Sequence, residues 1–259
     1  MKRWLIALFW LMLATAVQAA PEELQDYFYD QRPGNTLPAR PQFKDERGAE
    51  VALSRYAGGP PLIVLLGYFH CPNLCGLVRG NLLEALSNSG LVPGRDYRLI
   101  ALAIDPAETS QDAAAAKQTD LARYPLPGAD AAWHYLTGRH AAIGEVADAV
   151  GFRYRFQPEH KQFIHPAGIV FATPAGVISS YLLGVGYSAG DVRLGVTRAN
   201  EGSVAAKALP ILLLCFHYDP ATGRYSLAIM KVLRLASAIT VLTIGGTLFL
   251  AFRRERRGA

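Results

Sequence analysis

Two cysteines four residues apart are the clearest candidates for chemistry in this sequence. Cys71 and Cys75 lie in the segment GYFHCPNLC, residues 67–75, between a continuous apolar run and a helix-like stretch. If a helix begins there, positions i and i+4 share one face, with Cβ atoms about 6 Å apart. The two sulfurs then suit either one metal ion or, after modest movement, a redox-active disulfide. A purely structural disulfide or a pair of buried thiols is the alternative.

The chemistry of thiolate ligands directs the search to histidine. A helix N-terminus favours the thiolate form, and soft thiolates select Cu(I), zinc or iron-sulfur iron over calcium or magnesium. Two thiolates need at least one more ligand, and the chain offers six histidines: His70, His134, His140, His160, His165 and His217. Only His165, in FIHPAG, directly precedes a hairpin pattern. A lone histidine in a loop is more often a surface residue, so the residues alone leave His165 as a candidate.

The elements that must position these residues alternate between strand and helix patterns. Apolar runs predict strands over 61–66, 97–104 and 133–136, and a hairpin of strands 168–173 and 177–183 around Pro174-Ala175-Gly176. Helical patterns cover 77–90, 109–124, 139–150 and 188–199, with Thr109 or Ser110 as one cap and Gly151 as another. The order predicts a layered α/β domain with a mixed sheet.

Both ends of the chain carry targeting patterns. Residues 1–20 have a basic start, an apolar run and small residues before Pro21, which is typical of a signal peptide. Residues 227–252 predict one transmembrane helix, and the arginine-rich tail 253–259 places the C-terminus in the cytoplasm. We therefore expect a single-pass protein of the inner membrane whose functional domain faces the periplasm. The predicted domain covers 56–200, between an extended lead-in, 21–55, and a juxtamembrane segment, 201–226.

Charge and cysteine count exclude two classes. The net charge of +5 comes largely from the two ends, so the remainder is about neutral and gives no electrostatic reason to bind nucleic acid. Three cysteines in an exported chain cannot form a framework of several disulfides.

Several ordered motifs resemble the Sco/SenC copper chaperones across about residues 51–200. They are FHCPNLC (69–75), AIDPAET (103–109), LTG (136–138), VGFRY (150–154) and the His165 loop with its hairpin. The resemblance implies a thioredoxin-like fold and a role in building the copper centre of a respiratory cytochrome oxidase. It also implies that Cys71, Cys75 and His165 bind copper, as Cu(I) with Cu(II) as a second candidate. The implied partners are a copper-bearing oxidase subunit and a periplasmic copper donor or thiol reductant.

Three further positions follow from this comparison. Asp105 matches the family's aspartate-proline turn, as an outer support of the site or simply as a turn. Gly76 departs from the proline that the family commonly has after its second cysteine, and the C-terminal anchor departs from the usual N-terminal one. Cys215 and His217 share one face if that segment is extended, which makes them candidates for an auxiliary copper or redox site. The alternative there is a short apolar strand near the membrane.

Three functions remain open at this stage. The leading interpretation is a metallochaperone, in which reduced Cys71 and Cys75 with neutral His165 hold Cu(I). The second is a thiol-disulfide oxidoreductase that uses the same two cysteines to reduce the acceptor's thiols. A third and weaker interpretation is a peroxidase, which needs an arginine beside the attacking thiolate. No feature of the sequence indicates that Arg79 has that role.

Overall fold

The computed structural model describes residues 29–70, 75–159 and 161–207, with isolated positions between 218 and 246. Within these residues no helix combines the length and apolar character that crossing a bilayer requires. The predicted signal peptide, 1–20, and nearly all of the predicted membrane helix, 227–252, lie outside the described residues. His217–Ala259 forms a second unit, of which the structure gives a short antiparallel pair, β10 (Tyr218–Asp219) and β11 (Arg224–Tyr225).

A seven-stranded mixed sheet forms the centre of the domain, in the order β2-β1-β5-β4-β3-β8-β9. Its three parallel strands are β3 (Leu62–Gly67), β4 (Arg98–Ala103) and β5 (Trp133–Gly138). Antiparallel strands extend both sides: β8 (Gly168–Ala172) and β9 (Ile178–Leu183) beyond β3, and β1 (Gln42–Lys44) and β2 (Glu50–Ala52) beyond β5. The predicted mixed α/β architecture is confirmed.

The helices connect and cover these strands. They are α2 (Cys75–Ser87), α3 (Ser110–Arg123), α4 (Ala129–Ala132), α5 (His140–Val150) and α6 (Ala189–Asn200), with a 3-10 turn, η2 (Leu53–Tyr56). Thr109 and Ser188 each form a capping box, at the starts of α3 and α6. Gly151 ends α5 in the left-handed region at φ 66°, where a Cβ would collide with the carbonyl oxygen of Asp30. The four longer helices, α2, α3, α5 and α6, match the four helices predicted from the sequence.

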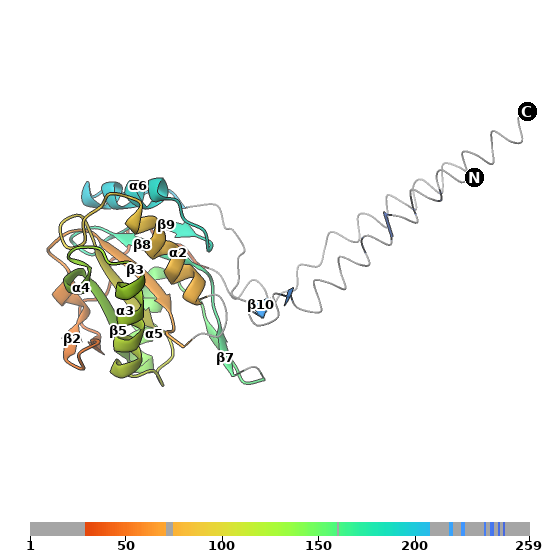
Figure 1. The fold of residues 1–259 in the computed structure, drawn as a ribbon, viewed down its shortest axis with the longest axis horizontal. Helices are drawn as coiled ribbons and strands as arrows, with labels where there is room; N and C mark the ends of the chain where they lie inside the picture. The colour runs from red at the N-terminus through yellow and green to blue at the C-terminus, as the bar shows by residue number, and fades with distance from the viewer. Residues whose placement is uncertain are drawn as a thin grey trace, which may run out of the picture. The chain divides into compact units, whose positions relative to one another are not determined.

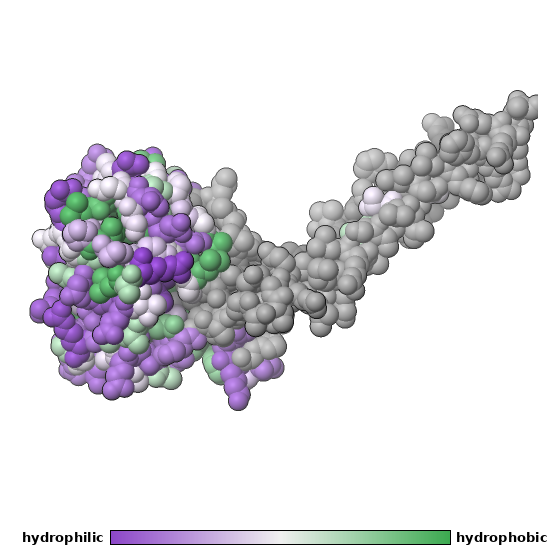
Figure 2. Space-filling view, in the orientation of Figure 1, coloured by the Kyte–Doolittle hydropathy of each residue, from purple (hydrophilic) through white to green (hydrophobic). Residues whose placement is uncertain are grey.

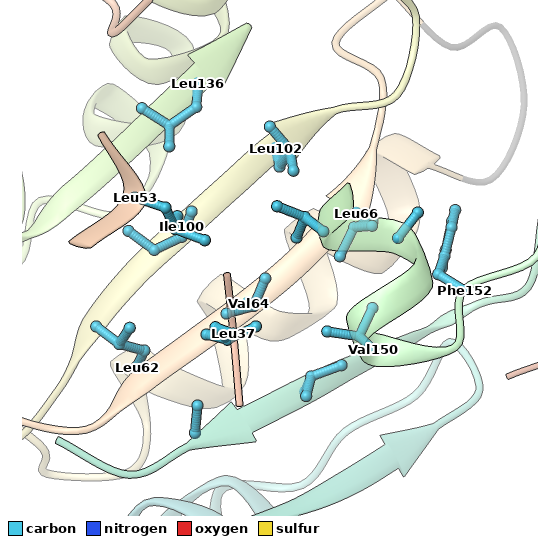
Figure 3. Packing of buried hydrophobic residues seen from close by; sticks show 14 of the residues in the cluster. Leu37, Leu53, Leu62, Val64, Leu66, Ile100, Leu102, Leu136, Val150 and Phe152 are labelled. Carbon is cyan, nitrogen blue, oxygen red and sulfur yellow. The ribbon is translucent and has the colours of Figure 1, made fainter. Parts of the chain in front are cut away.

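Strand β3 divides the core into two layers because successive side chains point to opposite faces. Leu62, Val64 and Leu66 belong to one layer, with β4, β5 and helix α5, and Figure 3 shows this packing around Ile100, Leu102, Leu136, Val150 and Phe152. Ile63 and Leu65 belong to the other layer, under α2, α3 and α6. Helices α2 and α6 lie side by side on that face (Figure 1). The strand that leads into the cysteine motif is therefore packed on both faces.

Two strand pairs were not predicted from the sequence. Strands β1 and β2 extend the sheet into residues 42–52, so the domain begins earlier in the chain than the expected boundary at residue 56. A hairpin of β6 (Arg155–Gln157) and β7 (Gln162–Ile164) precedes the His165 loop and projects from the body of the domain in Figure 1. The face of the domain shown in Figure 2 is mostly hydrophilic, with its hydrophobic residues in small separate patches.

Candidate functional site

The candidate site lies where the end of β3 meets the start of β8. These strands pair antiparallel, with Leu62 opposite Ala172 and Val64 opposite Val170. This register brings the residues that follow β3, which lead to Cys71, beside the residues that precede β8, which include His165. Residues 67–70 and 165–168 are 95 or more positions apart in the sequence, and the strand pairing brings them to the same end of β3 and β8.

His165 is a buried histidine, although a lone loop histidine is usually exposed. Its exposed fraction is 2%, and its ring contacts those of Phe152 and Tyr68, with centroids 5.5 and 6.0 Å away. Burial lowers the pKa of His165 to about 4, against a smaller opposing effect of the Pro166 carbonyl. The imidazole is therefore neutral at physiological pH, which is the form that binds metals.

The hydrogen bond of His165 selects its tautomer. Nδ1 lies 2.9 Å from the carbonyl oxygen of Pro166. A carbonyl oxygen only accepts, so Nδ1 carries the proton and donates, and the lone pair of the neutral ring is on Nε2. Metal-binding histidines commonly have this arrangement, because the bond from one nitrogen orients the other toward the ion.

A small cavity lies beside His165. Its volume is about 20 Å³, and its lining includes Gly67, Tyr68 and Phe69 after β3, Val78 and Arg79 from α2, and His165 with Pro166. About 10–15 Å³ is enough to hold one water molecule, so the cavity has room for a single small ion or water. The end of β3, the first turns of α2 and the His165 loop thus share one space.

The two cysteines are located only in part. Cys71 lies outside the described residues, and Cys75 is the first residue of α2, described for its backbone alone. Within the described part of the chain, no three His, Cys, Asp or Glu side chains gather closely enough to hold a metal ion. The auxiliary candidates Cys215 and His217 also lie outside the described residues.

Asp105 serves the turn after β4. Its Oδ1 accepts a hydrogen bond from the Ala107 N–H at 2.8 Å, and its carbonyl oxygen accepts one from the Glu108 N–H. This geometry supports the simpler of the two interpretations of Asp105, a turn that ends a strand and leads into α3. The same turn carries Glu108, which contacts the backbone of Phe69 and His70.

Sequence reasoning missed Glu108. Its side chain is 5% exposed, and its Oε1 accepts hydrogen bonds from the backbone N–H groups of Phe69 and His70, at 2.6 and 2.8 Å. Burial raises the pKa of Glu108 to about 7, against the opposing effect of these two bonds. The only sequence signal was its place in the AIDPAET motif, because the partners are 38 and 39 positions away.

Arg79 is held by an acidic partner. Its Nε donates to Oδ2 of Asp120 at 2.7 Å, and the same oxygen accepts a hydrogen bond from the Tyr135 hydroxyl. The guanidinium carbon also lies 5.8 Å from the centroid of the Phe69 ring. Because Asp120 compensates its charge, Arg79 is poorly suited to activate peroxide at a thiolate, which weakens the peroxidase interpretation.

The other described histidines differ from His165. The side chain of His70 is 67% exposed and lies 3.6 Å from Glu108 Oε1 and 3.7 Å from Asp112 Oδ1. His134, on β5, packs against the ring of Tyr56, and burial lowers the pKa of His134 to about 4. His140 is the exposed first residue of α5. Among the described histidines, His165 is the one that is buried at the junction of β3 and β8, whereas His70 is exposed there.

Comparison with known proteins identifies the family. The SCO1/SenC family model matches residues 30–188, which is more than half of the chain. The chain belongs to the SCO1/SenC family. The match also spans β1, β2 and the β6–β7 hairpin, so these unpredicted strands lie within the SCO1/SenC region. A search of curated protein sequences found no match to this chain.

Solved structures share the SCO1/SenC fold. A protein of Aquifex aeolicus VF5, described as a candidate electron transfer protein, is 26% identical, with a TM-score of 0.57 and coverage of 66% of this chain and 96% of that one. A SCO1/SenC lipoprotein of Bacillus anthracis is 15% identical, with a TM-score of 0.53 and coverage of 65% and 97%. Arabidopsis thaliana ScoI, solved with copper bound, is 16% identical, with a TM-score of 0.50 and coverage of 66% and 99%. The fold is thus that of the Sco proteins.

Proposed function

We propose that this protein binds Cu(I) through Cys71, Cys75 and His165 and delivers it to the copper centre of a respiratory cytochrome oxidase. The observation that carries the proposal is the state of His165. It is buried and neutral, and its hydrogen bond to Pro166 leaves the lone pair on Nε2. It also lines the small cavity shared with the residues that lead into the cysteine motif.

The ligand set favours copper over other metals. Two thiolates and one imidazole are soft or borderline donors, which suit Cu(I) and zinc and disfavour calcium and magnesium. A site with three protein ligands also leaves the ion accessible to an incoming thiolate, as transfer by ligand exchange requires. Arabidopsis ScoI, which has this fold, was solved with copper bound. Membership of the SCO1/SenC family is consistent with the same cargo.

The transfer step depends on the protonation and redox state of the ligands. Binding needs deprotonated thiols and a neutral imidazole, so Cu(I) affinity falls in acid. A disulfide between Cys71 and Cys75 removes both sulfur ligands, so oxidation blocks loading. The acceptor's thiolates displace Cys71 and Cys75 one at a time, and no net redox change of the copper is required.

We further propose that the domain works at the outer face of the cytoplasmic membrane. A cleaved signal peptide at 1–20 and a C-terminal helix at 227–252 with a basic tail would export the domain and tether it. Tethering raises the effective concentration of the chaperone near a membrane-bound oxidase. Protease accessibility of a C-terminal tag in intact spheroplasts tests this topology, because a cytoplasmic tag is protected.

The test of copper binding is an anaerobic titration of the reduced full-length protein with Cu(I) against a competing chelator. Replacing His165 with alanine should weaken Cu(I) binding by about 100-fold or more, since loss of a mere outer-shell partner already costs about 10–100-fold. His140→Ala, which removes an exposed histidine on α5, is the matched control and should bind like the wild type. Cys71→Ser and Cys75→Ser should each lose binding.

The same variants separate delivery of copper from thiol chemistry. A thiol-disulfide oxidoreductase needs the two cysteines but not the imidazole, so His165→Ala would leave its dithiol exchange rate largely intact. If His165→Ala binds Cu(I) as tightly as the wild type, His165 is not a copper ligand and the proposed site is wrong. Thiol reduction of the oxidase cysteines would then be the better description.

A further inference from the structure

A single buried carboxylate holds the backbone that leads into the cysteine motif. Both N–H groups of Phe69 and His70 donate to the same oxygen, Glu108 Oε1, at 2.6 and 2.8 Å. Two consecutive amides bound to one oxygen fix the direction of the chain at this point, which is one residue before Cys71. When Glu108 is ionised, these hydrogen bonds are roughly twice as strong as bonds to a neutral acceptor.

The turn that carries Glu108 is itself well ordered. The Asp105 side chain accepts from the Ala107 N–H, and the Glu108 N–H donates to the Asp105 carbonyl at 3.1 Å. Immediately after Glu108, Thr109 and Asp112 form the reciprocal capping box of α3. Glu108 is therefore presented from a short, hydrogen-bonded junction between β4 and α3 and not from a long loop.

The Phe69 side chain is fixed separately from its backbone. Its ring stacks on Tyr135, with centroids 5.6 Å apart, and lies under the guanidinium of Arg79. These contacts anchor the ring but leave the direction of the backbone after Phe69 undefined. Within the described part of the chain both N–H groups donate to Glu108, so the carboxylate fixes the backbone direction that the ring contacts leave open.

The burial of the Glu108 carboxylate is energetically unfavourable, which indicates a role other than general stability. Glu108 Oε2 is buried and has no hydrogen-bond partner among the described residues. Burying a carboxylate with one oxygen unsatisfied is unfavourable. A neutral acceptor would hold the two amides at a lower desolvation cost, so general stability alone does not explain a carboxylate at this position.

We propose that Glu108 is a positioning residue whose carboxylate fixes the backbone of Phe69 and His70 and thereby sets the direction in which the chain enters the proposed copper-binding motif. The part of the proposal that concerns copper rests on the proposed function. The latch itself, Glu108 with the N–H groups of Phe69 and His70, does not. Nothing in this role requires Glu108 to contact copper.

The experiment compares Glu108→Ala, Glu108→Gln and Glu108→Asp in the full-length reduced protein. The first measurement is amide hydrogen exchange resolved at Phe69 and His70 by mass spectrometry. In Glu108→Ala both amides lose their acceptor, and we expect their exchange to rise about tenfold or more. Glu108→Gln keeps a neutral acceptor and should be intermediate. Glu84→Ala, an exposed glutamate on α2, is the matched control and should leave both amides unchanged.

The second measurement is Cu(I) affinity by chelator competition in the same variants. We expect Glu108→Ala to bind about tenfold more weakly, which corresponds to one buried hydrogen-bonding interaction. Glu108→Asp should recover part of the affinity. A purely structural role would instead lower the unfolding temperature and speed exchange across α2 and α3, without a selective effect at Phe69 and His70.

Two results would overturn the proposal. Unchanged exchange at Phe69 and His70 in Glu108→Ala would show that the latch does not exist in solution. Faster exchange with a Cu(I) affinity within about threefold of the wild type would show that the latch does not position the ligand. If the wild type itself binds no Cu(I), the proposed function fails, and the latch is judged on amide exchange and on the alkylation rate of Cys71.

Discussion

Glu46 and Glu108 are two buried glutamates whose surroundings differ. Oε1 of Glu46 pairs with the ammonium of Lys117 at 2.6 Å, and its Oε2 accepts a hydrogen bond from the Tyr135 N–H. Lys117 in turn donates to the Asp130 carbonyl oxygen. Glu108 has no cationic lysine or arginine partner in the described residues, and only its Oε1 is hydrogen bonded.

The comparison shows two uses of a buried carboxylate in one domain. At Glu46, charge neutralisation and hydrogen bonds to both oxygens tie the β1–β2 connection to α3 and β5. At Glu108, the protein accepts an incompletely satisfied carboxylate beside the motif that leads to Cys71. The Glu46 region stabilises the scaffold. The Glu108 region lowers stability but fixes the backbone of Phe69 and His70. Substitutions in the two regions should therefore separate stability from copper affinity.

The largest expected effect is loss of the Glu46–Lys117 pair. Lys117→Met removes the ammonium and leaves the Glu46 carboxylate buried without its counter-charge, so the free energy of unfolding should fall by about 3–5 kcal/mol. Denaturant unfolding of the metal-free protein measures this. Arg95→Met, which breaks the exposed Arg95–Asp96 pair, is the control and should leave the free energy of unfolding almost unchanged. A Lys117→Met protein as stable as this control would show that the pair does not stabilise the scaffold.

The pH dependence of stability provides the next largest effect. The pKa of Glu108 is raised from 4.5 to about 7, so between these values the folded protein binds more protons at this site than the unfolded chain. Stability from this group is full below about pH 4.5 and declines as the pH rises to 7. Relative to Glu108→Gln, the reduced, metal-free wild type should lose about 3 kcal/mol across this window. Thermal unfolding from pH 4 to pH 8 measures the difference, and parallel curves would contradict it.

Two matching helix caps give the smallest and most selective comparison. Thr109→Ala and Ser188→Ala each remove one capping box, and each should lower the free energy of unfolding by about 1 kcal/mol. Thr109 adjoins Glu108, whereas Ser188 starts α6, which lies beside α2. Only Thr109→Ala should also weaken Cu(I) binding, by a few-fold, as measured by chelator competition. Equal Cu(I) affinities in the two variants would mean that the Glu108 turn does not depend on its cap.

The sequence predicted the elements whose patterns are local. Continuous apolar runs predicted β3, β4, β8 and β9, and the capping residues Thr109 and Gly151 predicted helix ends within one or two residues. The short strands β1, β2, β6 and β7 were not predicted because three residues are too few to show an alternating hydrophobic pattern. Strand β1 is recognisable only through its partner, since Phe43 pairs with Gly138 almost a hundred positions away.

The candidate site was predictable in type but not in its supports. The spacing of Cys71 and Cys75 and the family motifs predicted candidate ligands, but the burial of His165 and the tautomer selected by Pro166 required three-dimensional structure. The contacts of Glu108 and Arg79 could not be predicted for a different reason. A charged residue in a sequence carries no sign of which distant group it meets, and their partners are 38 to 41 positions away.

Strand β3 supplies side chains alternately to both layers of the core, and this has a consequence for cargo exchange. Its residues from Leu62 to Leu66 are 6% exposed or less, so the strand opens only with the whole domain. The segment just beyond it is held instead by its contacts with Glu108 and Tyr135. Residues 68–70 can therefore rearrange while the sheet beneath them stays rigid, so the proposed exchange of copper would not require the domain to unfold.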